Sequence, residues 1–312
     1  MVGLTMKLYI GVTDNDWYSF LSQLSGVDEV NFWQPGGNQL FKALAPGELF
    51  LFKLHSPKNF IVGGAFFTHS SLLPINLAWE AFGAKNGAVT FDVMRSRAAK
   101  YRRNKDPNQR DFTIGCILLQ HPFFLPQSDW IPAPSDFSLN IVQGKTYDLD
   151  SGTGKDLWDA LQLRARSRPA IQLQVGDGQV TWGNPAMVRQ RLGQGAFRIL
   201  VTDTYERRCA VTNEKALPAL EAAHIKPVTE EGKHRVDNGL LFRSDIHRLF
   251  DKGYVTVTPD YKFRASRKLK DEFDNGEEYF RLDGNSIWLP KASDAKPNRE
   301  FLEWHSDTVF RG

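Results

Sequence analysis

Short hydrophobic runs separated by glycine and proline make up most of the first half of the chain. Runs of this length that are rich in β-branched and aromatic residues are typical of strands, and four are predicted, at residues 7–12, 49–54, 61–67 and 113–119. Two short helices are predicted at 17–25, beginning from Asp14 or Asp16, and at 77–82. The pattern predicts a mixed sheet, curved into a small and partly open β-barrel, with helices beside it.

A change of pattern marks the end of this unit. A proline-containing stretch at 130–136 and a turn at 148–154 precede a predicted helix at 155–166, which has a partly apolar face. A loop or hairpin is expected at 176–184, and a second helix, interrupted near 193–195, over 186–205. The chain is therefore expected to be an α+β protein in three parts: residues 1–150, a helical linker at 151–185, and residues 186–312.

Length and composition place the chain among ordinary globular proteins. The 312 residues leave room for two domains, and 41% hydrophobic with 24% charged residues excludes wholesale disorder. No apolar run approaches the roughly 18 residues that cross a bilayer, and residues 1–10 lack the features of a secretion signal. Cys116 and Cys209 are far apart, which excludes a disulfide framework and a cysteine-rich zinc cluster. We therefore expect a cytoplasmic protein without a membrane segment.

The net charge of +3 is small and unevenly distributed. Residues 1–150 carry 13 basic and 13 acidic side chains, which leaves 26 and 23 for residues 151–312. Overall charge therefore does not indicate a nucleic-acid-binding protein, but a dense basic run lies in the first half. A run of this kind either contacts phosphates or is a solvated face, and the residues considered for DNA contact are Arg95, Arg97, Lys100, Arg102 and Arg103.

The segment that is richest in candidate chemistry lies between residues 219 and 251. A strand is predicted at 219–225, a polar loop at 228–237 and a second strand at 240–242, followed by a helix that Ser244 or Asp245 caps. His247 and Asp251, four positions apart, share one face of that helix. A strand–loop–strand–helix unit that brings His224, Asn238 and His247 together is suited to hold a divalent ion beside a general base.

These three residues resemble the signature of HNH nucleases, which have the ββα-metal fold. His247 follows Asn238 by nine positions, a spacing found in many of these nucleases. Residues 194–198 and 208–212 before the signature, and 273–276, 282–290 and 301–305 after it, resemble a bacterial restriction-type HNH family. The resemblance covers residues 186–312.

The resemblance implies a role for each signature residue in phosphodiester hydrolysis. His224 is expected to be the general base that deprotonates a water, a role that suits histidine because its ordinary pKa of about 6.5 leaves it neutral at physiological pH. His247 is expected to ligate the metal, which would be Mg²⁺, Mn²⁺ or another transition-metal ion. Asn238 would either orient His224 or brace the loop.

One position departs from the family pattern. Many HNH enzymes have a metal-ligating Asp or His immediately before the base, where this chain has Ala223. Glu221 or Asp251 is expected to replace it as a metal ligand. This departure also keeps open a catalytically degenerate DNA-binding protein.

Four other residues, in or near this segment, have two interpretations each. Cys209 resembles the first cysteine of zinc pairs in other HNH proteins, but no second cysteine follows closely, so a small buried residue is expected and no structural zinc. His234 is either a phosphate contact or part of a solvated loop, and the solvated loop is favoured. Arg243 and Arg248 flank His247 and are candidates to clamp a phosphate.

Residues 5–150 resemble, more loosely, the EVE-like domains of the PUA superfamily, which read modified bases. The resemblance rests on an aromatic segment at 32–37, a Pro-Gly turn into a hydrophobic strand at 44–53, and a strand at 60–67. A flipped base needs a pocket with aromatic or apolar walls. The wall candidates, each of which is otherwise a core residue, are Trp33, Trp79, Trp130 and Phe32. Trp33 is the first choice, because a tryptophan in a Pro-Gly-Gly loop is less easily buried than one on a strand.

Together these patterns predict a modification-dependent DNA restriction endonuclease. A sensor at residues 1–150 would flip and read a modified base, most plausibly a modified cytosine, in double-stranded DNA, and an HNH domain at 186–312 would cut. Because one HNH site cuts one strand, a double-strand break requires two subunits or two binding events, and a homodimer is expected. An HNH nuclease that reads backbone phosphorothioate or ordinary sequence is the alternative.

Overall fold

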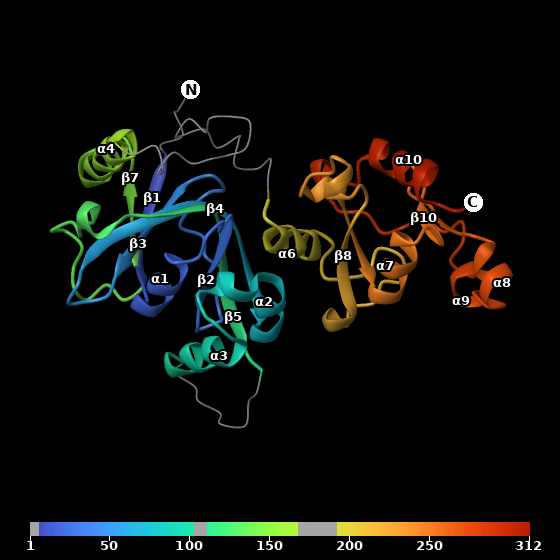
Figure 1. Ribbon diagram of the computed structural model, residues 1–312, viewed down its shortest axis with the longest axis horizontal. Helices are drawn as coiled ribbons and strands as arrows, with labels where there is room; N and C mark the ends of the chain where they lie inside the picture. Colours follow the sequence, from blue (N-terminus) through green and yellow to red (C-terminus); the bar gives the residue numbers. More distant parts are fainter. Residues whose placement is uncertain (1–5, 103–110, 168–191) are drawn as a thin grey trace. The chain divides into compact units, whose positions relative to one another are not determined.

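A computed structural model of the chain describes residues 6–102, 111–167 and 192–312. The chain divides into two compact units, Met1–Arg189 and Gln190–Gly312, and Figure 1 shows that each unit has its own sheet and its own helices. The fold is α+β, as predicted. Among the described residues no helix has the length and apolar character needed to cross a membrane.

In the described part of the first unit, seven strands form one mixed sheet. Six of them lie in the order β2-β5-β4-β3-β1-β7, and β6 pairs with β4. The β1–β3 pair is parallel and the other pairs are antiparallel. The strands are β1 (Lys7–Thr13), β2 (Glu29–Gln34), β3 (Leu49–Leu54), β4 (Phe60–Pro74), β5 (Thr113–Phe124), β6 (Ile131–Pro132) and β7 (Gly144–Asp148).

Both faces of this sheet are buried under hydrophobic clusters. Successive side chains of a strand point to opposite faces, so one strand contributes to both clusters. Leu49 and Leu51 of β3 belong to one hydrophobic cluster, while Phe50 and Phe52 belong to another. This two-sided burial explains why residues 49–52 are hydrophobic without interruption, and the sequence predicts the bounds of β3 correctly.

Helices cover both faces. Helix α1 (Asn15–Leu21) begins after Asp14, whose carboxylate accepts hydrogen bonds from two backbone N–H groups of the first turn, and it buries Trp17. Helix α4 (Gly152–Ser167) falls in the range predicted as a linker, yet it contributes Leu157 and Leu161 to the core of the first unit. The other helical segments are α2 (Ile75–Phe82), η1 (Gly83–Asn86), α3 (Phe91–Lys100) and η2 (Gln127–Asp129).

Several elements of this unit differ from the prediction. Strand β4 continues to Pro74 instead of ending at residue 67, and its pairing with β5 shifts register twice, between Gly64 and Phe66 and between Phe67 and His69. Strands β2 and β7 and helix α3 were not predicted. The loop or hairpin predicted at 176–184 lies outside the described residues.

The second unit contains a ββα arrangement. Strands β8 (Leu220–His224) and β9 (Gly239–Arg243) pair antiparallel, with His224 opposite Gly239, and α7 (Ser244–Asp251) follows directly. The residue in the capping position of α7 is Arg243, not Ser244 or Asp245 as predicted, and its side chain makes no capping hydrogen bond.

Helix α6 (Gln194–Thr204) packs against this hairpin. A Cβ atom on Gly239 would lie 2.4 Å from a methyl carbon of Val201 and 3.1 Å from the ring of Phe197, so the close approach of α6 to β9 requires glycine. The remaining elements are η4 (Leu217–Ala219), η5 (Val228–Glu230), η6 (Val236–Asn238), β10 (Val255–Val257), β11 (Phe263–Ala265), α8 (Lys268–Phe273), α9 (Glu277–Phe280), η7 (Ser293–Ala295) and α10 (Arg299–Thr308).

Candidate active site

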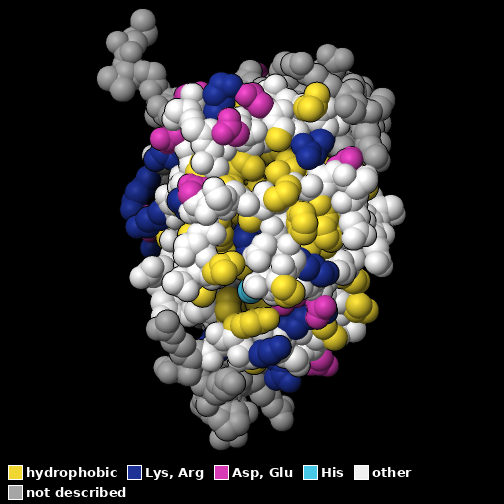
Figure 2. Space-filling model, turned by 90° about the vertical axis from the view of Figure 1, so that its left-hand side faces the viewer, with side chains coloured by type: hydrophobic (Ala, Val, Ile, Leu, Met, Phe, Trp, Pro, Cys, Tyr) yellow, Lys and Arg dark blue, Asp and Glu magenta, His cyan; other side chains and the backbone are white. Residues whose placement is uncertain are grey.

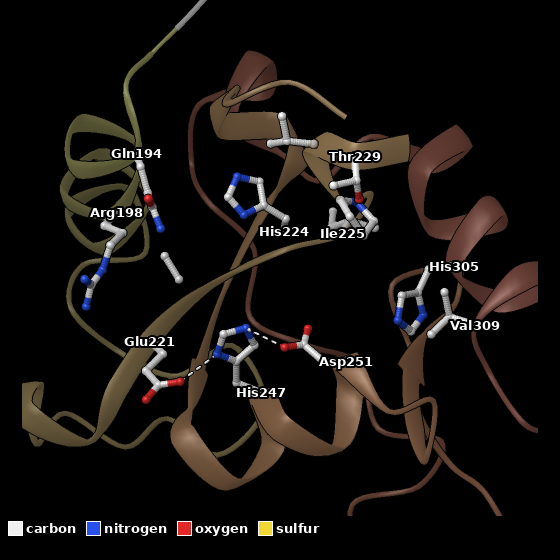
Figure 3. Close-up of a pocket in the computed structure, with 13 residues that line it drawn as sticks. Gln194, Arg198, Glu221, His224, Ile225, Thr229, His247, Asp251, His305 and Val309 are labelled. Atoms are coloured by element: carbon white, nitrogen blue, oxygen red, sulfur yellow. Dashed lines mark hydrogen bonds and ion pairs between the residues drawn. The ribbon is translucent and has the colours of Figure 1, made fainter. Parts of the chain in front are cut away.

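A pocket of about 510 Å³ lies in the second unit, over the ββα arrangement. Strand β8, helix α7, helix α6, the loop that follows β8 and helix α10 all contribute to its lining. Figure 3 shows His224 on one side of the pocket, and His247, Glu221 and Asp251 on another. Four of the residues predicted from the sequence therefore line one pocket.

His224, at the end of β8, is held by two aromatic neighbours. Its ring stacks on Phe197 of α6, with 3.9 Å between ring centroids and 14° between planes. Its Nε2 atom lies 2.9 Å from Nδ1 of His234. Burial, aided by the nearby His234 and His247, lowers the pKa of His224 to about 4. The ring is therefore neutral at physiological pH, which is the state that a general base needs.

His247, in the first turn of α7, lies between two carboxylates (Figure 3). Its Nδ1 atom is 2.6 Å from Glu221 Oε2, and its Nε2 atom is 3.4 Å from Asp251 Oδ2. Burial raises the pKa of Asp251, as does the charge of Glu221, while His247 lowers it. The i, i+4 spacing predicted for His247 and Asp251 thus produces a side-chain contact.

These three side chains fit a divalent ion by donor type. One imidazole nitrogen and two carboxylates suit Mg²⁺, Mn²⁺ or a transition-metal ion. In the arrangement described, however, no group of three or more His, Cys, Asp or Glu side chains converges on a metal position. Each carboxylate faces a different nitrogen of His247, so binding an ion requires these side chains to turn toward a common point.

Asn238 is fully buried and is not among the residues that line the pocket. Its Oδ1 atom accepts a hydrogen bond from the backbone N–H of Lys226, and its Nδ2 group donates to the carbonyls of Lys226 and Lys233. These bonds join the two ends of the loop at 226–233. Of the two roles considered for Asn238, they match the bracing of the loop.

The arginines near His247 differ in their contacts. The guanidinium of Arg243 binds both carboxylate oxygens of Asp245, at 2.7 Å each, and Glu278 at 2.6 Å. Those hydrogen bonds raise the pKa of Arg243 further, and a phosphate would have to compete with two carboxylates for this side chain. Arg248, which lies on α7 next to His247, is exposed.

Helix α6 and helix α10 contribute pocket residues that the sequence did not single out. Arg198 and Gln194 line the pocket from α6, and Figure 3 places them on one side of it. Both lie in the segment 194–198 that resembles the HNH family, which was the available signal. His305 of α10 also lines the pocket, but it is buried and donates to the Phe250 carbonyl while its other nitrogen meets the Thr256 hydroxyl.

Cys209 holds the end of β9 in place through its sulfur atom. It is fully buried, and its Sγ atom accepts hydrogen bonds from the backbone N–H groups of Thr212 and Arg243. These contacts match the interpretation of Cys209 as a small buried residue, and they fix the end of β9 from which α7 begins.

Two of the aromatic candidates of the first unit lie on β2, Trp79 lies on α2, and Trp130 lies between η2 and β6. Trp33 belongs to β2 and not to the loop that follows, and its half-buried indole donates to the Asn86 carbonyl at 3.0 Å. Phe32 points to the opposite face of β2, where its ring centroid is 4.8 Å from that of Phe50. All four rings are partly buried, and those of Phe32, Trp33 and Trp130 pack against a core cluster.

The first unit also has a hollowed face. Figure 2 shows hydrophobic side chains gathered around a hollow on this side of the molecule. The assignment of Trp33, Trp79, Trp130 and Phe32 to a base pocket stays a prediction.

Four members of the basic run have contacts within the first unit, since Arg95 lies 4.0 Å from Asp92 and Lys100 lies over the Tyr101 ring. Arg97 donates to the Gly87 carbonyl at 2.9 Å, and Arg102 donates to the Thr113 carbonyl and packs on the Phe112 ring. Arg95 and Lys100 lie on α3, where Lys100 is exposed. Arg103 lies outside the described residues.

Comparisons with known proteins agree with the geometry of the second unit. Residues 209–258 match the family model for HNH endonucleases. A search of curated proteins found no match.

Two solved structures show weak similarity. An ASCH protein from Zymomonas mobilis is 11% identical with a TM-score of 0.34, over 50% of this chain and 94% of that chain. The modification-dependent restriction endonuclease TagI is 13% identical with a TM-score of 0.29, over 85% of this chain, which spans 62% of TagI. Neither likeness defines the fold. The family match, in contrast, spans His224, Asn238 and His247, and residues 209–258 are therefore an HNH endonuclease domain within this chain.

Proposed function

We propose that this protein is a modification-dependent DNA restriction endonuclease. The HNH domain would hydrolyse DNA, and the first unit would flip a base, most plausibly a modified cytosine, out of the duplex and read it. One observation carries the nuclease proposal. A neutral, immobilised His224 shares a pocket with His247 and two carboxylates inside the segment that matches the HNH family.

The residues of the pocket divide the chemistry among them. His224 takes a proton from a water molecule, whose oxygen then bonds to phosphorus. The P–O bond to the leaving oxygen breaks, and that oxygen takes a proton from solvent. Arg198 adds positive charge beside the pocket for the phosphate.

A divalent ion, held by His247 with Glu221 or Asp251, would neutralise charge on the phosphate and on the leaving oxygen. The donor types fit this role, as described above. This part of the proposal is tested by chelation, because activity that survives EDTA would exclude the ion from the reaction.

The proposal for the first unit rests on aromatic and basic side chains. Reading a base within a duplex requires it to leave the stack and enter a pocket that has aromatic or apolar walls. Trp33 and Trp79 are partly exposed rings on β2 and on α2, and Arg95 and Lys100 on α3 supply positive charge for the backbone.

A cleavage assay tests the whole proposal. Duplexes of one sequence carry no modification, modified cytosines, or phosphorothioate linkages, and each is incubated with wild type or His224→Ala in Mg²⁺ or Mn²⁺. We expect wild type to cut the cytosine-modified duplex faster, and His224→Ala to cut none of them. Equal cutting of all three would remove the reader function, and cutting of the phosphorothioate duplex alone would establish the alternative mark. No cutting by wild type would favour a degenerate DNA-binding protein, an alternative suggested by Ala223 at the position where many HNH enzymes have a metal ligand.

Cleavage of circular DNA that carries modified cytosines tests the proposed homodimer. A single HNH site cuts one strand, so nicked circles should precede linear DNA, and the linear fraction should rise with the protein concentration. Linear DNA as the first product of a monomer in dilute solution would contradict the dimer.

A further inference from the structure

His234 is the neighbour of the proposed base that the nuclease function leaves unexplained. It lies in the loop between β8 and β9, ten positions after His224, and its Nδ1 atom is 2.9 Å from His224 Nε2. The two rings meet edge to face, with 4.9 Å between centroids. The 2.9 Å separation of the two nitrogen atoms is that of a hydrogen bond.

The position of His234 is fixed by the backbone around it. Its carbonyl accepts a hydrogen bond from the backbone N–H of Leu192, and the carbonyl of the preceding residue, Lys233, accepts one from Asn238. Gly232 packs against the start of the loop, where a Cβ atom would lie 2.0 Å from the Lys226 carbonyl oxygen. The loop therefore holds the His234 ring in place against His224.

The contact restricts how His224 can act as a base. Two neutral imidazoles at hydrogen-bond distance share one proton between the facing nitrogens. If His234 donated that proton, His224 Nε2 would accept it as a hydrogen bond and His224 Nδ1 would carry the ring's own hydrogen. Neither nitrogen of His224 could then take a proton from water. If His224 donates through Nε2, its Nδ1 atom keeps a lone pair that can take a proton from water.

We propose that His234 is a positioning residue for His224, which accepts the Nε2–H hydrogen bond and thereby holds His224 in the tautomer whose Nδ1 atom is the base. This inference rests on the proposed nuclease function. When Nδ1 takes the proton, the ring becomes an imidazolium, and the bond to His234 becomes charge-assisted and stronger. Phe197 holds the face of the same ring, so stacking and hydrogen bonding together define its orientation.

Two variants separate the hydrogen bond from packing. His234→Phe keeps an aromatic ring beside Phe197 and His224 but has no acceptor. His234→Asn places its Oδ1 atom near the position of Nδ1 and keeps an acceptor. Glu230→Gln, an exposed position in the same loop, is the matched control.

The first measurement is the tautomer of His224, which needs no nuclease activity. Nitrogen-15 NMR at pH 7 without DNA distinguishes protonated from unprotonated ring nitrogens, and the His224 signals are identified by their loss in His224→Ala. We expect one tautomer, with hydrogen on Nε2, in wild type, His234→Asn and Glu230→Gln, and a mixture in His234→Phe. Hydrogen on Nδ1 in wild type, or an unchanged single tautomer in His234→Phe, would overturn the proposal.

The second measurement is the cleavage rate. For His234→Phe we expect kcat to fall about 10- to 100-fold, with KM for DNA within about twofold of wild type, and we expect His234→Asn to recover most of kcat. A His234→Phe variant that cuts as fast as wild type would overturn the positioning role. If wild type itself does not cut, the proposed function fails, and the NMR result still decides whether His234 sets the tautomer.

Discussion

At the residue scale, burial determines the chemistry of the two histidines whose pKa values depart most from normal. His224 and His305 both have pKa values lowered to about 4, and burial is the main cause for each. Only His224 has access to the pocket as a base, because both nitrogens of His305 are bonded within the unit. The same physical effect therefore serves catalysis in one residue and packing in the other.

The low pKa of His224 predicts the pH dependence of cleavage. A base works in its neutral form, which is populated above the folded-state pKa, so kcat/KM at saturating metal should not decline between pH 8 and pH 5 through this group. A base with the ordinary pKa of about 6.5 would instead lose about tenfold by pH 5.5. A pH profile of nicking decides between them, and a tenfold fall by pH 5.5 would contradict the buried base.

The low pKa of His305 predicts the pH dependence of stability. Because the folded-state pKa lies below the unfolded value, the unfolded chain binds the proton first as pH falls, and stability decreases from about pH 6.5 down to pH 4. Between pH 7 and pH 5 the loss is about 2 kcal/mol. Urea unfolding of wild type and His305→Phe measures it, with the exposed His55→Phe as control. An equal pH dependence in His305→Phe would refute the assignment.

The sequence identified the signature residues better than their neighbours. The resemblance to HNH nucleases selects His224, Asn238 and His247, and the structure places His224 and His247 in one pocket, because a ββα unit fixes the distance between a strand end and a helix face. His234 was expected to be solvated, because a residue in a polar loop has no periodic pattern that reveals its contacts. Trp33 was assigned to a loop, because the Pro-Gly-Gly sequence that follows it marks a turn but does not locate the end of the strand.

At the scale of elements, Asn238 joins both ends of the loop between β8 and β9. Its side chain satisfies one backbone N–H and two carbonyls. Asn238→Ala should therefore destabilise the protein by about 2–4 kcal/mol, since each buried polar group left unpaired costs about 1–3 kcal/mol and water will reach some of them. Chemical denaturation measures this effect. Asn285→Ala, in an exposed turn, is the control, and equal stability of the two variants would contradict the bracing role.

The elements that the sequence predicted best have a simple burial pattern. Strand β3 is buried on both faces and was found with its correct bounds. Strand β2 was missed because it buries polar residues, Glu29 and Asn31, where a hydrophobic pattern is expected. Strand β4 was cut short because its register shifts interrupt the alternation of side chains.

At the scale of the whole molecule, the proposed function assigns recognition and cleavage to different units. The proposed reader residues lie in Met1–Arg189 and the active-site residues in Gln190–Gly312. His224→Ala should therefore cut at least about 100-fold more slowly and bind modified DNA with a Kd within about twofold of wild type.

The reciprocal change is Trp33→Ala, which should lose the preference for modified DNA and keep the slow cutting of unmodified DNA. Binding measured by fluorescence anisotropy, together with nicking rates, checks both variants. Trp288→Ala, which changes a tryptophan of the second unit, controls for the loss of a large side chain. If Trp33→Ala cuts modified DNA as selectively as wild type, Trp33 is not a reader residue.

The two cysteines give each unit its own reporter of unfolding. Cys116 lies in β5 of the first unit and Cys209 precedes the ββα arrangement of the second, and neither is exposed. A thiol reagent can reach each sulfur only when the structure around it opens. The rates at which wild type, Cys116→Ala and Cys209→Ala are alkylated in dilute denaturant therefore report the opening of each unit separately, without any label having to be introduced.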